Sequence, residues 1–87
     1  MMKGVVTHNN RTFYVGQQFK HFKGKIYKIV AFCTNAETQE TLVIYRKYGH
    51  QEIYARSLTS FASEVNHEKY PNIRQHWRFE PLTKGGD

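Results

Sequence analysis

The chain has 87 residues and a net charge of +6 with histidine neutral, because 13 lysines and arginines outnumber seven acidic residues. This length predicts a single domain, residues 1–82, with a thin stability margin because a short chain buries little surface. The only cysteine, Cys33, excludes an intrachain disulfide and a CxxC metal site. The basic charge either favours an anionic partner, such as nucleic acid or a nucleotide, or is simply a soluble basic surface.

The distribution of apolar residues argues against a membrane protein. No apolar run approaches the roughly 20 residues that span a bilayer. At the N-terminus, Val5 and Val6 are followed at once by polar residues, which is unlike a signal peptide. We therefore expect a cytoplasmic protein with no membrane partner.

Short β-prone segments run along most of the chain. Asn9 and Asn10 tolerate the positive φ of a tight hairpin turn, and Lys23-Gly24 and Gly49 are further turn signals. The candidate strands are rich in β-branched and aromatic residues. They are 3–8, 11–15, 19–22, 25–33, 41–47, 52–57 and 77–80.

After the sixth candidate strand the apolar period changes from that of a strand to that of a helix. The apolar residues at helical spacing are Leu58, Phe61, Ala62 and Val65. They predict a short helix over 58–65, with Ser57 or Thr59 as its N-cap. Residues 66–76 are predicted as loop, and 83–87 as a disordered tail.

A run of short strands with one helical turn predicts a mainly β protein. We expect a small, strongly bent sheet or a partly open SH3-like barrel, with one short helix near residues 58–65. Both faces of the central strands carry apolar or aromatic groups, so the second face is covered by the helix, a partner chain or a ligand. Alternation in 25–33 predicts two faces: Ile26, Lys28, Val30 and Phe32 against Tyr27, Ile29, Ala31 and Cys33.

Tyrosines and cations on the second face form a candidate ligand site. Tyrosine rings offer faces for stacking, and the cations offer donors to phosphate. The alternative is that the tyrosines fill the core. The candidate ligand-binding residues are His21, Lys23, Tyr27, Tyr45, Tyr48, Tyr54 and Arg56.

Three stretches of the sequence resemble a known family. They are "HFKGKIYKIV" at 21–30, "ETQETLVIYRKYG" at 37–49 and "IYARSLTSF" at 53–61. With "RFE" at 78–80, they resemble a bacterial and phage domain-of-unknown-function family, number sixteen fifty-three, over residues 16–80.

The resemblance implies a small β-rich domain and no established chemistry. The family's His-Ser-Glu-Thr motif is Asn35-Ala36-Glu37-Thr38 here, and one residue is missing before Tyr48. The N-terminal hairpin, 3–15, is an addition to the family pattern.

No catalytic, metal or cofactor signature is present. The five histidines form neither an HxH nor an HExxH spacing, and the glycines form no phosphate loop. His21 with Glu37 or Glu40 could form an acid/base pair, but their loop position is the only support for it. We therefore expect no enzyme activity, no metal and no cofactor.

The expected function is the non-enzymatic binding of an anionic, nucleotide-like small molecule by a homo-oligomer. In a phage, such a protein would act as a sponge for a nucleotide signal of host defence. The first alternative is a nucleic-acid-binding module for RNA or single strands, because aromatics lie among cations. The second alternative is a protein–protein adaptor.

Overall fold

The computed structural model describes residues 4–82, so the predicted tail at 83–87 and the first residue of the predicted strand 3–8 lie outside the described residues. Each predicted strand is present, with ends shifted by no more than two residues. The elements are β1 (Val5–His8), β2 (Arg11–Tyr14), β3 (Gln18–His21), β4 (Ile26–Thr34), β5 (Thr41–Lys47), β6 (Ile53–Ser57), α1 (Leu58–Phe61) and β7 (Phe79–Pro81).

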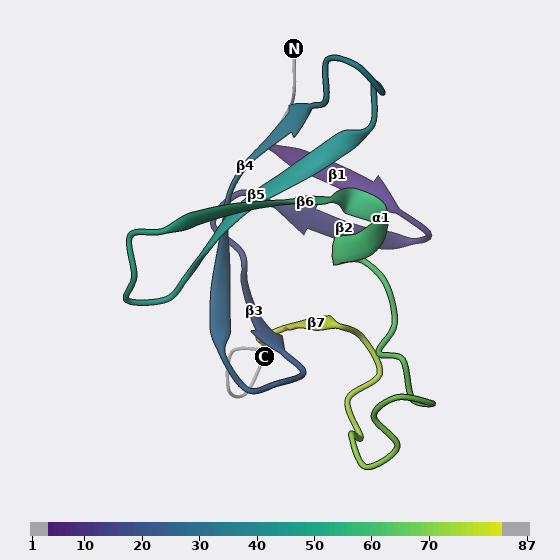
Figure 1. The fold of residues 1–87 in the computed structure, drawn as a ribbon. Helices are drawn as coiled ribbons and strands as arrows, with labels where there is room; N and C mark the ends of the chain where they lie inside the picture. Colours follow the sequence, from purple (N-terminus) through teal and green to yellow (C-terminus); the bar gives the residue numbers. More distant parts are fainter. Residues whose placement is uncertain (1–3, 83–87) are drawn as a thin grey trace.

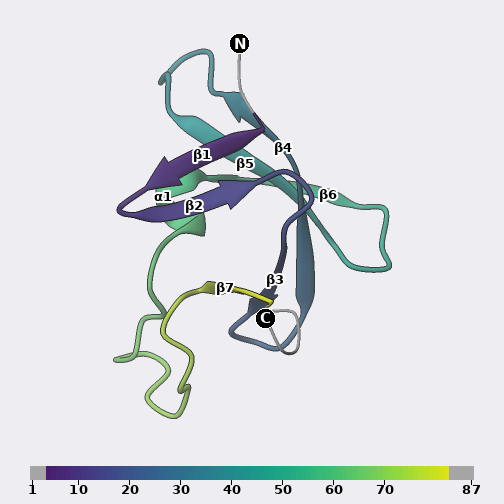
Figure 2. The same cartoon turned by 180° about the vertical axis from the view of Figure 1, so that it is seen from behind.

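Five of the strands form one antiparallel sheet in the order β6-β5-β4-β3-β7, and β1 pairs with β2 in a separate hairpin. The long strands β4 and β5 bend strongly, and the hairpin and α1 overlie the same part of them (Figure 1). The view from behind shows the same arrangement (Figure 2). The predicted mainly β fold with a bent sheet is confirmed, and the sheet does not close into a barrel because β6 and β7 remain its edges.

An aromatic core joins the sheet, the hairpin and α1. The rings of Phe61 in α1 and Phe79 in β7 stack with centroids 4.1 Å apart and planes 6° apart. Phe19 and Tyr45 meet Phe61 edge-on, each with a centroid distance of 5.3 Å. Each such ring pair is worth about 0.5–1.5 kcal/mol beyond area burial. The buried cluster consists of Phe13, Phe19, Ile29, Phe32, Val43, Tyr45, Leu58, Phe61, Ala62 and Phe79.

A β-bulge at Val30 changes which side chains of β4 face the core. The pairing with β5 shifts between Ile29 and Ala31, so Val30 is the extra residue of the bulge. As a result Ile29 and Phe32 are both buried while Val30 is exposed. The predicted faces of 25–33 are therefore wrong beyond Ile29, because strict alternation leaves no place for an extra residue.

The helix is shorter than the predicted 58–65. Ser57 caps it as expected, by accepting a hydrogen bond from a backbone N–H of the first turn, but α1 ends at Phe61. Glu64 instead forms a β-bridge with Trp77. Backbone pairing with the segment before β7 thus replaces the second helical turn.

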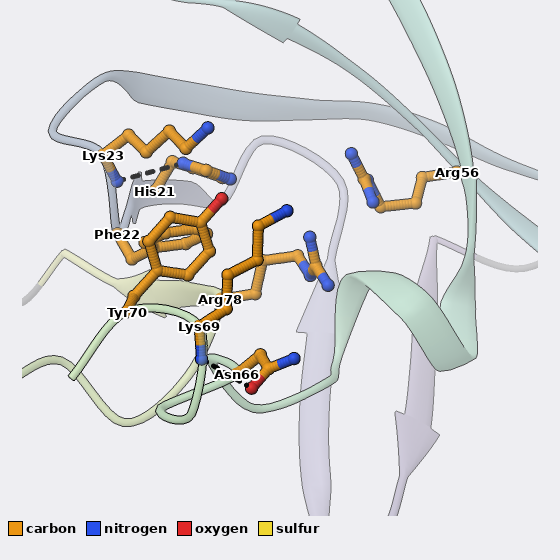
Figure 3. Close-up of a pocket in the computed structure, with 8 residues that line it drawn as sticks. All are labelled: His21, Phe22, Lys23, Arg56, Asn66, Lys69, Tyr70 and Arg78. Atoms are coloured by element: carbon orange, nitrogen blue, oxygen red, sulfur yellow. Dashed lines mark hydrogen bonds between the residues drawn. The ribbon is translucent and has the colours of Figure 1, made fainter. Parts of the chain in front are cut away.

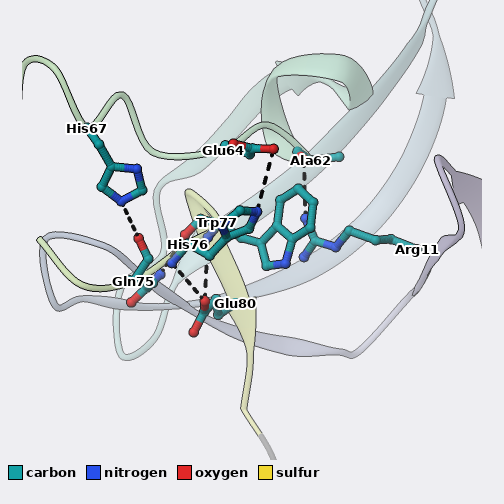
Figure 4. A network of polar contacts seen from close by, with 8 residues as sticks. All are labelled: Arg11, Ala62, Glu64, His67, Gln75, His76, Trp77 and Glu80. Atoms are coloured by element: carbon teal, nitrogen blue, oxygen red, sulfur yellow. Dashed lines mark hydrogen bonds and ion pairs between the residues drawn. The ribbon is translucent and has the colours of Figure 1, made fainter.

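Arg11 ties the hairpin to the end of α1 and to β7 (Figure 4). Its guanidinium donates to the carbonyl oxygens of Ala62 at 3.2 Å and Phe79 at 2.9 Å, and lies 4.2 Å from the Trp77 ring centroid. Glu80 accepts from the backbone N–H of Trp77 at 3.4 Å and of the preceding residue at 3.1 Å. These contacts fix the segment that leads into β7.

Phe13→Ala tests whether the hairpin belongs to the core. Phe13 is 1% exposed, whereas its neighbour Tyr14 on the same strand is 50% exposed. We expect Phe13→Ala to lower the free energy of unfolding by about 3–5 kcal/mol, because a large ring leaves a cavity. Urea unfolding followed by circular dichroism measures this change.

Tyr14→Ala is the matched control, because it removes a ring from the solvent side of the same strand. We expect it to change the free energy of unfolding by about 0.5 kcal/mol or less. Equal effects of the two substitutions would contradict the packing of the hairpin against the sheet.

Candidate functional site

A cleft of about 440 Å³ opens between the β3–β4 turn, β6 and the segment that leads into β7 (Figure 3). Four of its eight lining residues are lysines or arginines. Among the described residues, no aspartate or glutamate lines it. The lining residues are His21, Phe22, Lys23, Arg56, Asn66, Lys69, Tyr70 and Arg78.

The four cations come from separate parts of the chain. Lys23 lies in the turn after β3, Arg56 in β6, Lys69 in the loop between α1 and β7, and Arg78 immediately before β7. Because β3 pairs with β7 opposite His21, the β3–β4 turn and Arg78 lie at the same end of the sheet. The charged ends of Arg56, Lys69 and Arg78 point toward one another in Figure 3.

Neutral hydroxyl groups hold both arginines in place. Arg56 donates from Nε to the Tyr45 hydroxyl at 3.2 Å and from Nη1 to the Ser60 hydroxyl at 3.0 Å. Arg78 donates from Nε to the Ser63 hydroxyl at 3.0 Å. Within residues 4–82, Nη2 of Arg56 and both terminal nitrogens of Arg78 are left without a hydrogen-bond partner. The two guanidinium groups, or arginine forks, are therefore held in orientation while their positive charges are not neutralised.

The carboxylates near this end of the molecule have other partners. Glu64 lies 3.5 Å from His76, Glu52 accepts from the Tyr54 hydroxyl at 3.1 Å, and Glu80 binds backbone N–H groups. In the described part of the chain, none of the four cleft cations is in an ion pair. An incoming anion would thus meet uncompensated charge.

His21 lies between these cations and the core. Its Nδ1 accepts from the backbone N–H of Lys23 at 3.1 Å, so the neutral ring carries its proton on Nε2. Its ring meets Phe79 edge-on with a centroid distance of 4.9 Å. Burial lowers the pKa of His21 to about 4, and the charges of Arg78, Arg56 and Lys23 contribute in that order. At neutral pH this ring is an uncharged donor.

An aromatic pair forms one wall of the cleft. The rings of Phe22 and Tyr70 lie 5.0 Å apart, and the ammonium groups of Lys23 and Lys69 lie 5.6 and 5.5 Å from the centroid of Tyr70. Asn66 shapes the loop by accepting from the backbone N–H of Lys69 at 3.1 Å. The loop therefore presents a ring and a cation together.

Three of the seven predicted site residues line the cleft, namely His21, Lys23 and Arg56. Tyr45 is buried in the core and reaches the site only through its hydroxyl, which holds Arg56. Tyr27 and Tyr54 pack against Tyr45 with ring centroids 5.5 and 5.6 Å away, and neither lines the cleft. These three tyrosines therefore hold Arg56 in place through Tyr45 and do not belong to the lining of the cleft.

Tyr48 lies apart from the other predicted residues. Its side chain is 67% exposed and lines a second cavity of about 380 Å³ together with Lys28, Arg46 and His50. The turn after β5 carries it to this separate cavity, so the structure does not bring Tyr48 into the cleft.

Sequence reasoning missed five lining residues: Phe22, Asn66, Lys69, Tyr70 and Arg78. Arg78 precedes the buried Phe79 in a predicted strand, so alternation turns it away from the core, and this was a usable signal. The loop residues carried no such signal, because only the tertiary fold brings 66–70 beside the β3–β4 turn.

Glu37 and Glu40, the acid/base partners considered for His21, do not line the cleft. Across residues 4–82, no three His, Cys, Asp or Glu side chains are grouped as metal ligands would be. In the same part of the chain, the helix is too short to cross a membrane.

The model of a family described as "Protein of unknown function (DUF1653)" matches residues 17–81. The chain belongs to this family. The match confirms the resemblance found in the sequence, and no curated protein and no solved structure matches significantly. Every residue that lines the cleft lies within the DUF1653 segment, whereas the β1–β2 hairpin precedes it.

In this DUF1653 protein, we expect His21 to titrate near pH 4 by NMR. The folded-state pKa lies below the unfolded value of about 6.5. Stability contributed by the neutral ring is therefore complete above that unfolded value and is lost as the pH falls toward 4. Arg78→Gln should raise the pKa of His21, because Arg78 lowers this pKa more than the other nearby positive charges do.

Lys20→Gln is the control for this titration, because Lys20 is exposed on the same strand and is not among the charges that lower the pKa. We expect it to leave the pKa of His21 within experimental error. A His21 pKa near 6.5 in the unmodified protein would contradict the described surroundings of the ring.

Proposed function

We propose that this DUF1653 protein binds an anionic, nucleotide-like small molecule in the cleft without catalysing a reaction on it. The observation that carries the proposal is that Arg56 and Arg78 are oriented by hydroxyl groups instead of carboxylates. Like charges held together without counter-charges repel one another, and a bound anion relieves that repulsion. The arrangement suits a charged ligand better than a structural ion-pair network.

The size and chemistry of the cleft support a nucleotide-like ligand. Its volume of about 440 Å³ lies within the range of about 300–1,000 Å³ that is typical of small-molecule sites. Arginine forks bind phosphate oxygens in pairs, and Lys23 and Lys69 add further positive charge. The wall formed by Phe22 and Tyr70 offers apolar surface beside the cations for the flat part of the ligand.

Binding without turnover suits sequestration. The cations of the cleft are lysines and arginines, and His21, the histidine beside them, is neutral near pH 7, which suits holding an anion better than transferring a proton to it. In a phage member of the family, we propose that the protein removes a nucleotide signal of host defence from the cytoplasm.

A nucleic-acid-binding module is the second candidate, and one observation favours it. Lys28 faces Arg46 directly across β4 and β5, a like-charge pair that costs stability unless an anion lies over it. Tyr48 lies beside this pair in the second cavity. A nucleic acid that used both cavities would show a steep loss of affinity with salt.

The predicted homo-oligomer stays a prediction. Ile53 and Val30 leave apolar side chains exposed on the sheet, at 56% and 36%. A second copy would bury such residues, and a protein–protein adaptor would use them for another partner. Light scattering during size-exclusion chromatography distinguishes a monomer from an oligomer.

Lys69→Gln tests the cleft as the ligand site. We expect ADP to raise the melting temperature of the unmodified protein, and Lys69→Gln to weaken ADP binding by about tenfold, the value of one charge-assisted hydrogen bond. Arg46→Gln removes the same charge outside the cleft and should leave ADP binding unchanged. Thermal shift across a concentration series measures both effects.

Equal weakening by the two substitutions would contradict a cleft-specific site and would favour nucleic acid, because total charge would then decide affinity. The same assay with a short RNA at two salt concentrations checks that outcome. If neither nucleotides nor RNA change the melting temperature, both binding proposals are overturned and the protein–protein adaptor is favoured.

A further inference from the structure

The side chains that line the cleft offer many hydrogen-bond donors and almost no acceptors. Lysine and arginine have only donors. His21 turns its single acceptor, Nδ1, to the backbone of the adjacent turn, and the side-chain oxygen of Asn66 already accepts from two backbone N–H groups. The Tyr70 hydroxyl is the one lining side-chain group that has an acceptor to spare in the described residues.

A site whose side chains offer far more donors than acceptors distinguishes the parts of a nucleotide. Phosphate oxygens only accept, so every one of these donors can pair with them. The amino groups of bases only donate, and ribose hydroxyls carry one donor proton as well as acceptor lone pairs, so these ligand donors would find few acceptors among the side chains of the cleft. Since unpaired buried donors cost free energy, the cleft is suited to the phosphate end of a ligand.

The charge of the cleft favours a ligand with more than one phosphate group. A single phosphate monoester carries about −1.5 to −2 at neutral pH, which balances only about half of the charge of Lys23, Arg56, Lys69 and Arg78. An internal phosphodiester balances still less. Two linked phosphate groups come closer to neutrality, and the charged ends of Arg56 and Arg78, which come from β6 and from the segment before β7, point toward one another where such a ligand would lie (Figure 3).

We propose that the cleft takes two linked phosphate groups, as in inorganic pyrophosphate or the diphosphate of a nucleotide, between the forks of Arg56 and Arg78. This assignment rests on the cleft being the ligand site, as proposed above, and it names the class of ligand: a diphosphate instead of a monophosphate or a cyclic phosphodiester.

Isothermal titration calorimetry at one fixed salt concentration tests the assignment with inorganic phosphate, inorganic pyrophosphate, AMP, ADP and 3′,5′-cyclic AMP. We expect pyrophosphate to bind at least about tenfold tighter than phosphate, and ADP at least about tenfold tighter than AMP, with cyclic AMP weakest. AMP or cyclic AMP binding as tightly as ADP would overturn the diphosphate assignment and leave the nucleotide site standing. No binding by any of the five would overturn both.

Arg78→Lys separates fork recognition from charge, because it keeps the charge and removes the paired donors. We expect it to weaken pyrophosphate binding more than phosphate binding, at a melting temperature close to that of the unmodified protein. Arg46→Lys, outside the cleft, is the matched control and should change neither affinity. Equal losses for phosphate and pyrophosphate in Arg78→Lys would contradict the bridging of the two forks by a diphosphate.

Discussion

The stack of Phe61 on Phe79 is the contact on which the site depends. It joins α1 to β7, a three-residue strand at the edge of the described sheet, where its neighbouring strand is β3. Arg78 is next to one stacked ring, and Ser60, which holds Arg56, is next to the other. The aromatic core therefore sets the distance between the two arginine forks, although neither ring lines the cleft. Packing and electrostatics are coupled through this pair.

The cleft holds charge that the fold could have neutralised. The carboxylates of Glu64 and Glu80 lie in the same part of the chain, yet they bind His76 and backbone N–H groups instead of the cleft cations. Hydroxyl groups orient the forks without cancelling their field, and the charges help to keep His21 neutral. Repulsion among the cations lowers the stability of the free protein, and an anion that fits the cleft restores it. This is the physical basis of the proposed binding.

The sequence predicted the strands well because their signals are local. Asn9 and Asn10 adopt the positive φ that their turn requires, with values of 49° and 67°. It did not predict the bulge at Val30 or the bridge between Glu64 and Trp77, because both depend on pairing with another segment of the chain. The tyrosine face proved to be core and support, and Lys69 and Tyr70 reach the cleft through the tertiary fold, which no sequence pattern could place. Phe13, before the family segment, also belongs to the buried cluster.

Backbone NMR during a titration with ADP tests the central claim most directly, because it shows where the anion binds. We predict that the amide shifts cluster at the cleft residues, in 21–23, 66–70 and 78, and at Arg56. The signals of the second cavity, at Lys28 and 46–51, should stay unchanged. Shifts spread over both cavities, or confined to the second one, would contradict the account.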